Sequence, residues 1–228
     1  MLEYPTLSYT DFSLVARCPR ALSVAKTPEQ TGLPPMSYST RDSARDYLAG
    51  FQELLGGLDL DAVARAVDLL RRARDSGATI YIAGNGGSAA TATHLANDLG
   101  KATKRSGCTP MRVLSLSDNV SWLTALANDE GYERVFTGQL ENFAKPGDLL
   151  IVISASGNSP NLIEAVDYAG GQELETLGIL GFDGGALKDR VDECLWLESE
   201  AGLYGPVESG HSVICDILTT CLMQDQPR

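Results

Sequence analysis

The first regular pattern of apolar and polar residues begins at Ser39. From there apolar residues recur at spacings of three and four. This pattern predicts a helix that ends at the glycine pair 56–57. Ser39 and Asp42 fit a capping box at its start. A second predicted helix follows a cap at Asp59 and stops at Gly77. Its expected apolar face consists of Leu60, Val63, Val67, Leu70 and Ala73.

Both helices precede the first candidate strand, so their apolar faces need a partner. They could pack on one another or against another copy of the chain. Residues 1–35 contain five prolines, at positions 5, 19, 28, 34 and 35, and show no sustained period. We therefore expect an irregular arm over 1–38, followed by a single domain over 39–228. Met36 could be a natural start, or the arm could pack on a neighbouring subunit.

After Gly77 short runs of Ile, Leu and Val alternate with helical patterns. This alternation predicts an α/β fold, in which helices cover both faces of a parallel sheet. The expected strands are 79–83, 112–116, 148–153, 176–180 and 193–197. The expected helices lie at about 88–100, 118–127, 131–144, 159–170 and 184–190, with a last helix near 206–223.

Composition and charge narrow the range of functions. The chain has 228 residues and a net charge of −12, and its 18 basic residues form no dense cluster, which argues against nucleic-acid binding. No apolar run approaches the roughly 20 residues of a membrane span, and no secretory signal is apparent. The five cysteines are an odd number without metal-finger spacing, which is typical of reduced thiols. We therefore expect a cytoplasmic protein.

A glycine loop, Gly84-Asn-Gly-Gly-Ser88, follows the first predicted strand and opens a helix. Glycines let backbone N–H groups approach a ligand closely, and a helix N-terminus favours negative charge. The loop lacks the dinucleotide fingerprint, because Ala89 stands where a third glycine is needed. It also lacks the Gly-Lys-Ser/Thr of a Walker loop. The alternative is a tight strand-to-helix turn without a ligand.

A serine loop, Ser154-Ala-Ser-Gly-Asn-Ser159, follows the third predicted strand and leads into Pro160, a residue suited to the first turn of a helix. Hydroxyl groups at a helix N-terminus can bind a phosphate monoester without lysine. The alternative is a serine-rich cap. Because ligands of parallel sheets lie beyond the carboxyl ends of the strands, the two loops together suggest a sugar-phosphate site.

Two helices carry the charged side chains of interest. His94 and Asp98 are four residues apart and share a helix face. The last helix is apolar apart from a few residues, among them Glu208, His211 and Asp216. Buried carboxylates need a partner or a metal, so these side chains are candidates for function. A surface hydrogen bond is the alternative for the pair of His94 and Asp98.

Together these motifs resemble those of the sugar isomerase (SIS) domain family, most closely its sedoheptulose 7-phosphate isomerase (phosphoheptose isomerase) branch. The resemblance covers about 40–222. It implies a three-layer α-β-α sandwich with a five-stranded parallel sheet, and a homotetramer with active sites at subunit interfaces. The motifs that carry it are Gly84-Asn-Gly-Gly-Ser88, His94-x-x-x-Asp98, Asn128-Asp129-x-Gly131-Tyr132, Ser154-x-Ser-Gly-Asn-Ser159 and Gly181-x-Asp183-Gly-Gly185.

The resemblance assigns roles by position. Three serines match the family's phosphate-binding positions, and residues of the glycine loop match its sugar-binding positions. The substrate-binding set implied in this way is Asn85, Gly86, Gly87, Ser88, Asp129, Ser154, Ser156, Gly157, Asn158 and Ser159.

Four positions correspond to the family's metal-binding and catalytic residues. His94 matches its first metal ligand, and Asp98 replaces a glutamate that is both ligand and base. Glu208 and Asp216 replace a glutamine and a histidine, and Ala102 stands where an arginine is usual. The resemblance thus implies one divalent metal on His94, Asp98, Glu208 and Asp216. Zinc is expected, and manganese is the alternative because the set is rich in carboxylates.

The hypothesis is an isomerase that converts sedoheptulose 7-phosphate to a heptose 7-phosphate through a cis-enediolate. The base is Glu208 or Asp98, and a neighbouring carboxyl such as Asp216 is the acid. The alternative is a protein without catalysis, either a sugar-phosphate sensor or a protein-binding regulator such as one that binds a replication initiator. Neither reading involves nucleic acid or a membrane as partner.

Overall fold

The computed structural model describes residues 39–104 and 108–225 of the chain. The expected arm over 1–38 and the alternative start at Met36 lie outside these ranges. The contacts divide the chain into two compact units, with the boundary after Glu53. The second unit, Leu54–Arg228, holds one sheet of five parallel strands in the order β2-β1-β3-β4-β5. This confirms the α/β fold with a parallel sheet.

The strands differ from the expected ranges by one residue at most at each end. They are β1 Thr79–Gly84, β2 Arg112–Ser115, β3 Leu149–Ser154, β4 Glu175–Leu180 and β5 Glu193–Trp196. The α-helices are α2 Thr40–Gly56, α3 Leu60–Ser76, α4 Gly87–Asn97, α5 Val120–Asp129, α6 Thr137–Phe143, α7 Pro160–Gly171 and α8 Tyr204–Met223. Helix α4 continues into a π-helical turn, Asp98–Ala102.

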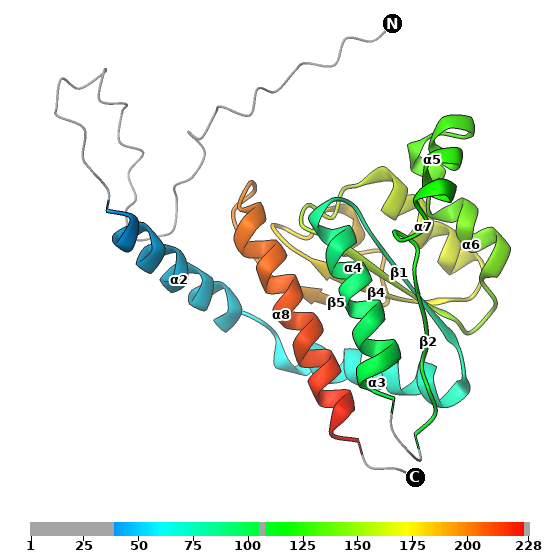
Figure 1. Ribbon diagram of the computed structural model, residues 1–228, viewed down its shortest axis with the longest axis horizontal. Helices are drawn as coiled ribbons and strands as arrows, with labels where there is room; N and C mark the ends of the chain where they lie inside the picture. The colour runs from blue at the N-terminus through cyan, green and yellow to red at the C-terminus, as the bar shows by residue number, and fades with distance from the viewer. Residues whose placement is uncertain (1–38, 105–107, 226–228) are drawn as a thin grey trace, which may run out of the picture. The chain divides into compact units, whose positions relative to one another are not determined.

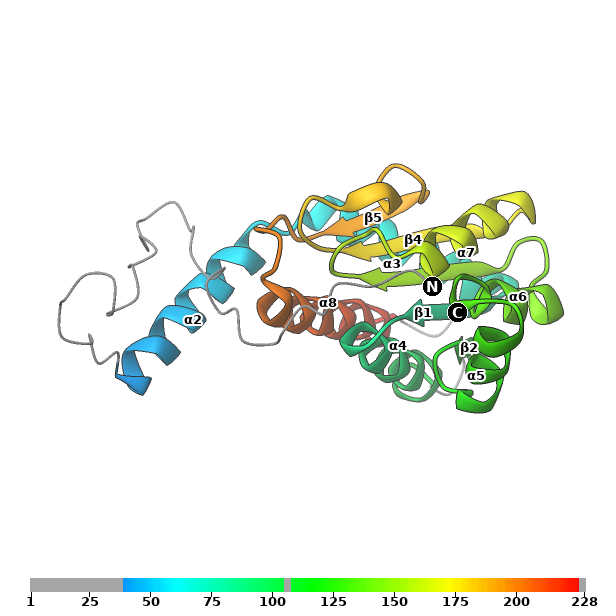
Figure 2. The ribbon, with the colours of Figure 1, turned by 90° about the horizontal axis from the view of Figure 1, so that it is seen from above.

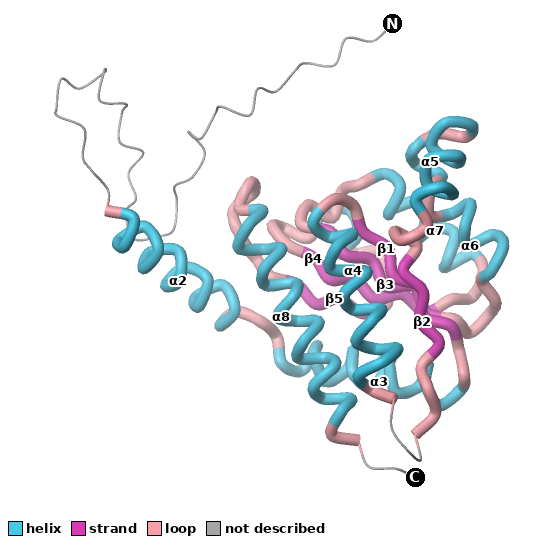
Figure 3. The backbone as a smooth tube through the Cα atoms, in the orientation of Figure 1, coloured by secondary structure: helices cyan, strands magenta, loops and turns pink. Residues whose placement is uncertain are grey.

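The sheet is the middle of three layers (Figures 1 and 3). Successive strand residues point to opposite faces, so β1 contributes Ile80 and Ile82 to one apolar cluster and Tyr81 and Ala83 to the other. Helices α3, α4 and α8 cover the first face, and α5, α6 and α7 cover the second. Figure 2 shows α4 and α8 on one side of the sheet and α6 and α7 on the other.

The two N-terminal helices begin where the sequence predicts. The Ser39 hydroxyl donates to Asp42 at 2.7 Å and accepts from the Asp42 backbone N–H at 3.2 Å, which is the Ser39 half of the expected capping box. The Asp59 carboxylate caps α3, which ends at Gly77 in a left-handed conformation. One expectation is wrong: Leu60 is 72% exposed, because it is the first residue of α3 and lies outside the buried face.

Two expected helices are shorter than predicted. The segment 131–144 begins with Gly131 at φ +106° and a single 3₁₀ turn, Tyr132–Arg134, before α6 starts at Thr137. Of the segment 184–190, only a 3₁₀ turn is helical, Gly185–Leu187, and it begins at the second of two glycines with positive φ, Gly184 and Gly185. Positive φ values are incompatible with a right-handed helix, so the glycines end the regular pattern.

No helix in the described ranges has the length and apolar character that a membrane crossing requires.

Candidate functional site

The glycine loop and the serine loop lie side by side at the carboxyl edge of the sheet. Strands β1 and β3 are neighbours, with Gly84 paired to Ile153. Each loop continues into a helix, α4 from Gly87 and α7 from Pro160. The two loops therefore present their helix N-termini at one place, as the sequence predicts.

A cavity of about 170 Å³ lies between these loops and the start of α8. Its polar lining combines side chains from three segments that are far apart in the sequence. The lining residues are Asn85, Ser88, Ile153, Ser154, Ala155, Ser156, Ser159, Leu162, Tyr204 and Glu208. Six of the predicted site residues thus meet at one cavity, and Tyr204 is an additional lining residue that no sequence motif identified.

The serine loop is held by its own hydrogen bonds. The Gly157 N–H donates to Ser154 Oγ at 3.0 Å, and the Asn158 N–H donates to Ser156 Oγ at 3.3 Å. The two hydroxyl oxygens act as acceptors in these bonds, so each hydroxyl keeps its hydrogen for an acceptor such as a phosphate oxygen. Ser159 occupies the N-cap of α7 without a side-chain capping bond. Three hydroxyls are therefore available to an anionic ligand.

The segment after β4, residues 184–187, holds the serine loop in place. Gly157 has φ +62°, and a Cβ there would lie 1.9 Å from the Gly184 carbonyl oxygen. The Leu187 N–H donates to the Gly157 carbonyl at 3.0 Å, and the Ala186 N–H donates to Asn158 Oδ1 at 2.9 Å. Only glycine allows this approach of two backbones. The side chain of Asn158 is thus used for support of the loop.

The glycine loop has close contacts of its own. Gly86 has φ +54°, and a Cβ on Gly84 would lie 2.6 Å from the Ser88 carbonyl oxygen. A Cβ on Gly87 would lie 2.4 Å from Glu208 Oε2. The Glu208 carboxylate therefore rests against the first residue of α4, where the helix N-terminus favours negative charge.

The side chain of Asn85 joins the two loops. Its Nδ2 donates to Asn161 Oδ1 and its Oδ1 accepts from Asn161 Nδ2, both at 2.9 Å. Its Oδ1 also accepts from the Tyr132 hydroxyl at 3.0 Å. Sequence reasoning missed Asn161. The signal available was a polar side chain in the first turn of α7, directly after the serine loop.

A second group of polar side chains, called the lower group below, lies farther from the cavity, towards the C-terminal ends of α4 and α8. His94, Asp98 and Asp216 offer ligand atoms that all lie within 4.8 Å of one another. His94 Nε2 is 3.2 Å from Asp98 Oδ2, and the two side chains are 52% and 22% exposed. Helices α4 and α8 pack side by side, which brings Asp216 to the pair (Figure 1). Three ligand atoms in this arrangement could bind a divalent cation.

Glu208 is not a member of this group. It precedes Asp216 by eight residues on the same helix, a rise of about 12 Å. The structure thus divides the predicted set of four into a group of three and a carboxylate at the cavity. Residues eight apart on a helix differ by about 12 Å along its axis, and the Glu208 carboxylate lies against Gly87, seven residues before His94 on α4.

Two further residues lie away from both places. Asp129, the last residue of α5, is exposed, accepts from the Asn128 amide at 2.7 Å and does not line the cavity. His211 on α8 is fully buried, and neither ring nitrogen makes a hydrogen bond of normal geometry within the described residues. Burial lowers the pKa of His211 to about 4, and the carbonyl of Leu180 opposes this shift in part.

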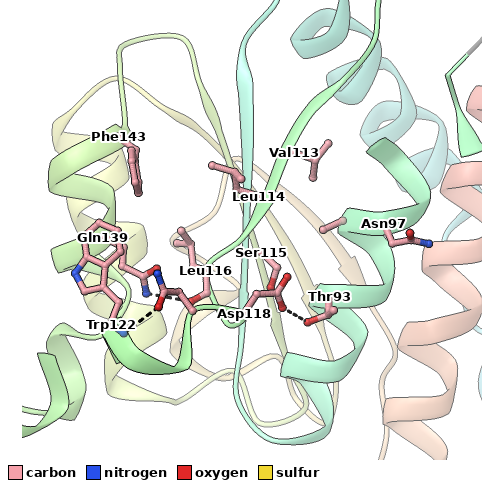
Figure 4. A pocket seen from close by; sticks show the side chains of 12 residues that line it. Thr93, Asn97, Val113, Leu114, Ser115, Leu116, Asp118, Trp122, Gln139 and Phe143 are labelled. Atoms are coloured by element: carbon pink, nitrogen blue, oxygen red, sulfur yellow. Dashed lines mark hydrogen bonds between the residues drawn. The ribbon is translucent and has the colours of Figure 1, made fainter. Parts of the chain in front are cut away.

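A larger hollow of about 490 Å³ follows edge strand β2 (Figure 4). Its walls are largely apolar, with Trp122 and Phe143 opposite α4, and the hydroxyl of Thr93 donates to Asp118 at its floor. None of the predicted site residues lines it. Size alone does not identify a site, and the smaller cavity is the candidate because the converging hydroxyls and the carboxylate are there.

Comparison with known proteins supports this assignment of the fold. The sequence profile of the SIS domain matches residues 46–181. The phosphoheptose isomerase of Trichlorobacter lovleyi is 37% identical over 182 residues, which cover 79% of this chain and 90% of the relative. That of Helicobacter pylori is 37% identical over 183 residues, covering 78% and 92%.

A solved structure gives the same result in three dimensions. The phosphoheptose isomerase of Neisseria gonorrhoeae superposes with a TM-score of 0.72 at 26% sequence identity, and the match covers 81% of this chain and 98% of that one. The profile matches more than half of the chain and the relatives align along most of their length. On these grounds the chain belongs to the SIS domain family.

Proposed function

We propose that this protein is an aldose–ketose isomerase of sugar phosphates that converts sedoheptulose 7-phosphate to a heptose 7-phosphate through a cis-enediolate. Its relatives in Trichlorobacter lovleyi and Helicobacter pylori are named phosphoheptose isomerases. One observation carries the proposal: a cavity lined by hydroxyl groups at two helix N-termini stands two helical turns above a group of one imidazole and two carboxylates.

The serine loop is the phosphate anchor in this proposal. Ser154, Ser156 and Ser159 line the cavity at the start of α7 and can each donate an O–H to a phosphate oxygen. Hydrogen bonds to an ionised acceptor are the strong ones, and the N-terminus of α7 adds a favourable dipole. A phosphate therefore binds here in spite of the acidic net charge of the chain.

The spacing of the two groups fits a seven-carbon substrate. Glu208 at the cavity and Asp216 in the lower group are separated by about 12 Å along α8. An open seven-carbon chain has six C–C bonds of about 1.5 Å, and with its phosphate ester it reaches roughly 10 Å. A substrate held by its phosphate at the serine loop thus extends its carbonyl end towards Asp98 and Asp216.

This spacing favours Asp98 as the base. The proton to be moved lies at C1 and C2, the end of the substrate that is farthest from the phosphate. Glu208 shares the cavity with the phosphate anchor, so its carboxylate is placed to accept hydrogen bonds from hydroxyls in the middle of the sugar. Asp98 and Asp216 are instead within reach of the carbonyl end, where Asp216 is the acid.

The proposed chemistry moves one proton between two carbons. Asp98 removes a proton from C1 of the ketose, and the C1–C2 enediolate forms as the electron pair shifts to the carbonyl oxygen at C2. Asp216 donates a proton to that oxygen. Asp98 then returns its proton to C2, while the hydroxyl at C1 gives its proton to Asp216 and becomes the aldehyde.

The lower group also fits a divalent metal. His94, Asp98 and Asp216 provide the three protein ligands that a catalytic zinc site needs, and the two carboxylates make manganese the alternative. A bound divalent ion would stabilise negative charge on the substrate oxygens at C1 and C2. Glu208 is left out of the proposed ligand set because of its position at the cavity.

We extend the proposal to a homotetramer with active sites at subunit interfaces. The side chain of His94 is exposed and that of Asp98 is partly exposed, which leaves room for a second subunit to cover the lower group. Helix α5 is rich in apolar residues but buries Leu126 alone, and Val120 and Leu114 nearby in the sequence are exposed.

A cytoplasmic location also remains part of the proposal, since Cys108, Cys194, Cys215 and Cys221 are all unpaired.

The test is an assay of metal-stripped protein with sedoheptulose 7-phosphate, followed by NMR in deuterated water, with zinc or manganese added back in turn. Aldose formation with deuterium at C2 supports the enediolate route, and restoration by one metal supports the three-residue ligand set. Saturable binding of the sugar phosphate without turnover under any metal would overturn the proposal in favour of a non-catalytic binding protein.

A further inference from the structure

Three segments of the chain meet at one amide. Asn85 lies on the loop after β1, Asn161 in the first turn of α7 and Tyr132 in the 3₁₀ turn after α5. The amides of Asn85 and Asn161 exchange two hydrogen bonds of 2.9 Å, and Tyr132 adds a third of 3.0 Å. Asn161 is 2% exposed, whereas Asn85 lines the cavity. The buried amide of Asn161 thus holds the amide of Asn85, which faces the cavity.

The hydrogen-bonding capacity of Asn85 is almost fully used by these contacts. Its Oδ1 has two lone pairs, one for Asn161 and one for Tyr132. Its Nδ2 has two N–H donors, one of which goes to Asn161. A single N–H of the side chain remains for a ligand. Asn85 can therefore donate to a sugar hydroxyl oxygen, but its side chain cannot accept from one.

We propose that Asn161 and Tyr132 are positioning residues, which act through Asn85 to hold the glycine loop at a fixed distance from the serine loop. The inference rests on the proposed function and deepens it. The glycine loop holds the sugar and the serine loop holds the phosphate, so this clamp sets how the carbonyl end of a bound substrate is aimed at the lower group.

Local structure explains why a clamp is needed. Asn85 is flanked by Gly84 and Gly86, and Gly86 adopts φ +54°. Glycines lose the most conformational freedom on folding and do not by themselves fix a loop. The serine loop, in contrast, is fixed by Gly184 and Leu187. The amide pair transfers that rigidity across to the glycine loop through the first turn of α7.

The proposal predicts a specific split in kinetics. Without the clamp, a substrate is still anchored by its phosphate, but its sugar is poorly oriented. A misplacement of about 1 Å costs on the order of 100-fold in rate. Asn161→Leu is therefore expected to lower kcat for sedoheptulose 7-phosphate by about 100-fold, while the inhibition constant of inorganic phosphate stays within about twofold of wild type.

Two further variants separate positioning from simple destabilisation. Tyr132→Phe removes one hydrogen bond at a side chain that is 57% exposed, so the fold is retained and kcat is expected to fall by about fivefold. In the double variant Asn85→Ala with Asn161→Leu, the two effects should not add, because both changes break the same pair. Asn142→Leu, which loses an amide bond to Gly138 at an exposed position on α6, is the control for the same substitution away from the cavity and keeps wild-type kinetics.

Hydrogen exchange of the peptide that contains residues 84–88 gives a readout that does not depend on catalysis. In Asn161→Leu this peptide is expected to exchange faster than in wild type, and the peptide that contains residues 154–159 to exchange at the wild-type rate. If the peptide with residues 84–88 exchanged faster in Asn161→Leu but the wild-type protein showed no turnover, the proposed function would be wrong and the clamp would stand. Three results would overturn the clamp. The first is wild-type kcat and wild-type exchange in Asn161→Leu, and the second is a loss of phosphate affinity in that variant as large as its loss of kcat. The third is additive effects on kcat in the double variant.

Discussion

The two ends of the candidate site are built in different ways. The upper end, at the cavity, consists of backbone turns and short side chains that are fixed by close glycine contacts and by hydrogen bonds between loops. The lower end consists of His94, Asp98 and Asp216, which project from helix surfaces into partly exposed space. The shape of the upper end therefore depends on backbone packing, whereas the lower end depends on side chains at the surface of two helices.

This difference has a functional consequence. A phosphate is the same in every sugar phosphate, so a rigid anchor is useful for the whole family of substrates. Under the proposed function, the side chains that move protons are partly exposed, and their exchange is expected to leave the fold intact. By the sequence resemblance, Asp98, Glu208 and Asp216 stand where the family's pattern has a glutamate, a glutamine and a histidine, while three serines stand at the proposed phosphate anchor.

The largest effect is expected at the lower end. Asp98→Asn keeps the shape of the side chain but removes the base, so kcat should fall by about 1000-fold, in the usual range for general acid–base catalysis. The free energy of unfolding should change by less than about 1 kcal/mol, since the pair with His94 is partly exposed. Steady-state kinetics and urea denaturation measure the two quantities. If Glu208→Gln lost more activity than Asp98→Asn, the assignment of the base would be wrong.

At the upper end, function and stability should be lost together. Gly157→Ala forces φ +62° on alanine and places its Cβ 1.9 Å from the Gly184 oxygen. We expect a loss of about 3 kcal/mol or more in unfolding free energy, together with loss of phosphate binding. Gly147→Ala is the control, because it has φ +85° with nothing within 4 Å, and should cost about 1 kcal/mol. Equal losses in the two variants would mean that the close contact is unimportant.

His211 lies between the two ends on α8 and should make the protein sensitive to acid. Its pKa is lowered from 6.5 to about 4 by burial, so the unfolded chain binds a proton at higher pH than the folded one. The free energy of unfolding should therefore fall between about pH 6.5 and pH 4, by up to about 3 kcal/mol. In His211→Leu the decline over this range should be smaller by that amount, as measured by urea denaturation at several pH values. An unchanged decline would contradict this account of His211.

The smallest effect is expected from a single hydroxyl of the anchor. Ser159→Ala removes one donor to the phosphate and should raise KM by about tenfold with little change in kcat, because the bond is equally present in ground and transition states. Its thermal stability should equal that of wild type, since the Ser159 side chain makes no capping bond to α7. A large fall in kcat instead would show that the anchor contributes to the chemical step.

Local patterns were sufficient to predict most of the fold. The alternation of apolar strands and amphipathic helices specified the layers, and Asp59 and Gly77 marked the ends of α3 because caps are local interactions. The pattern failed where single glycines with positive φ interrupt a helical sequence, as at Gly131 and at Gly184. The φ value of a glycine depends on what packs around it, and a sequence does not state that.

The candidate site divides in the same way. The sequence by itself determined the two loops at the carboxyl edge, since each depends on one strand, one turn and one helix that are contiguous. It also identified His94 with Asp98, because residues four apart share a helix face. Only the tertiary structure decided that Asp216 joins this pair while Glu208 lies at the cavity, and that Asn161 holds Asn85. Those relations depend on how α8 and α7 pack against distant segments, and packing distances are fixed only when the whole chain is folded.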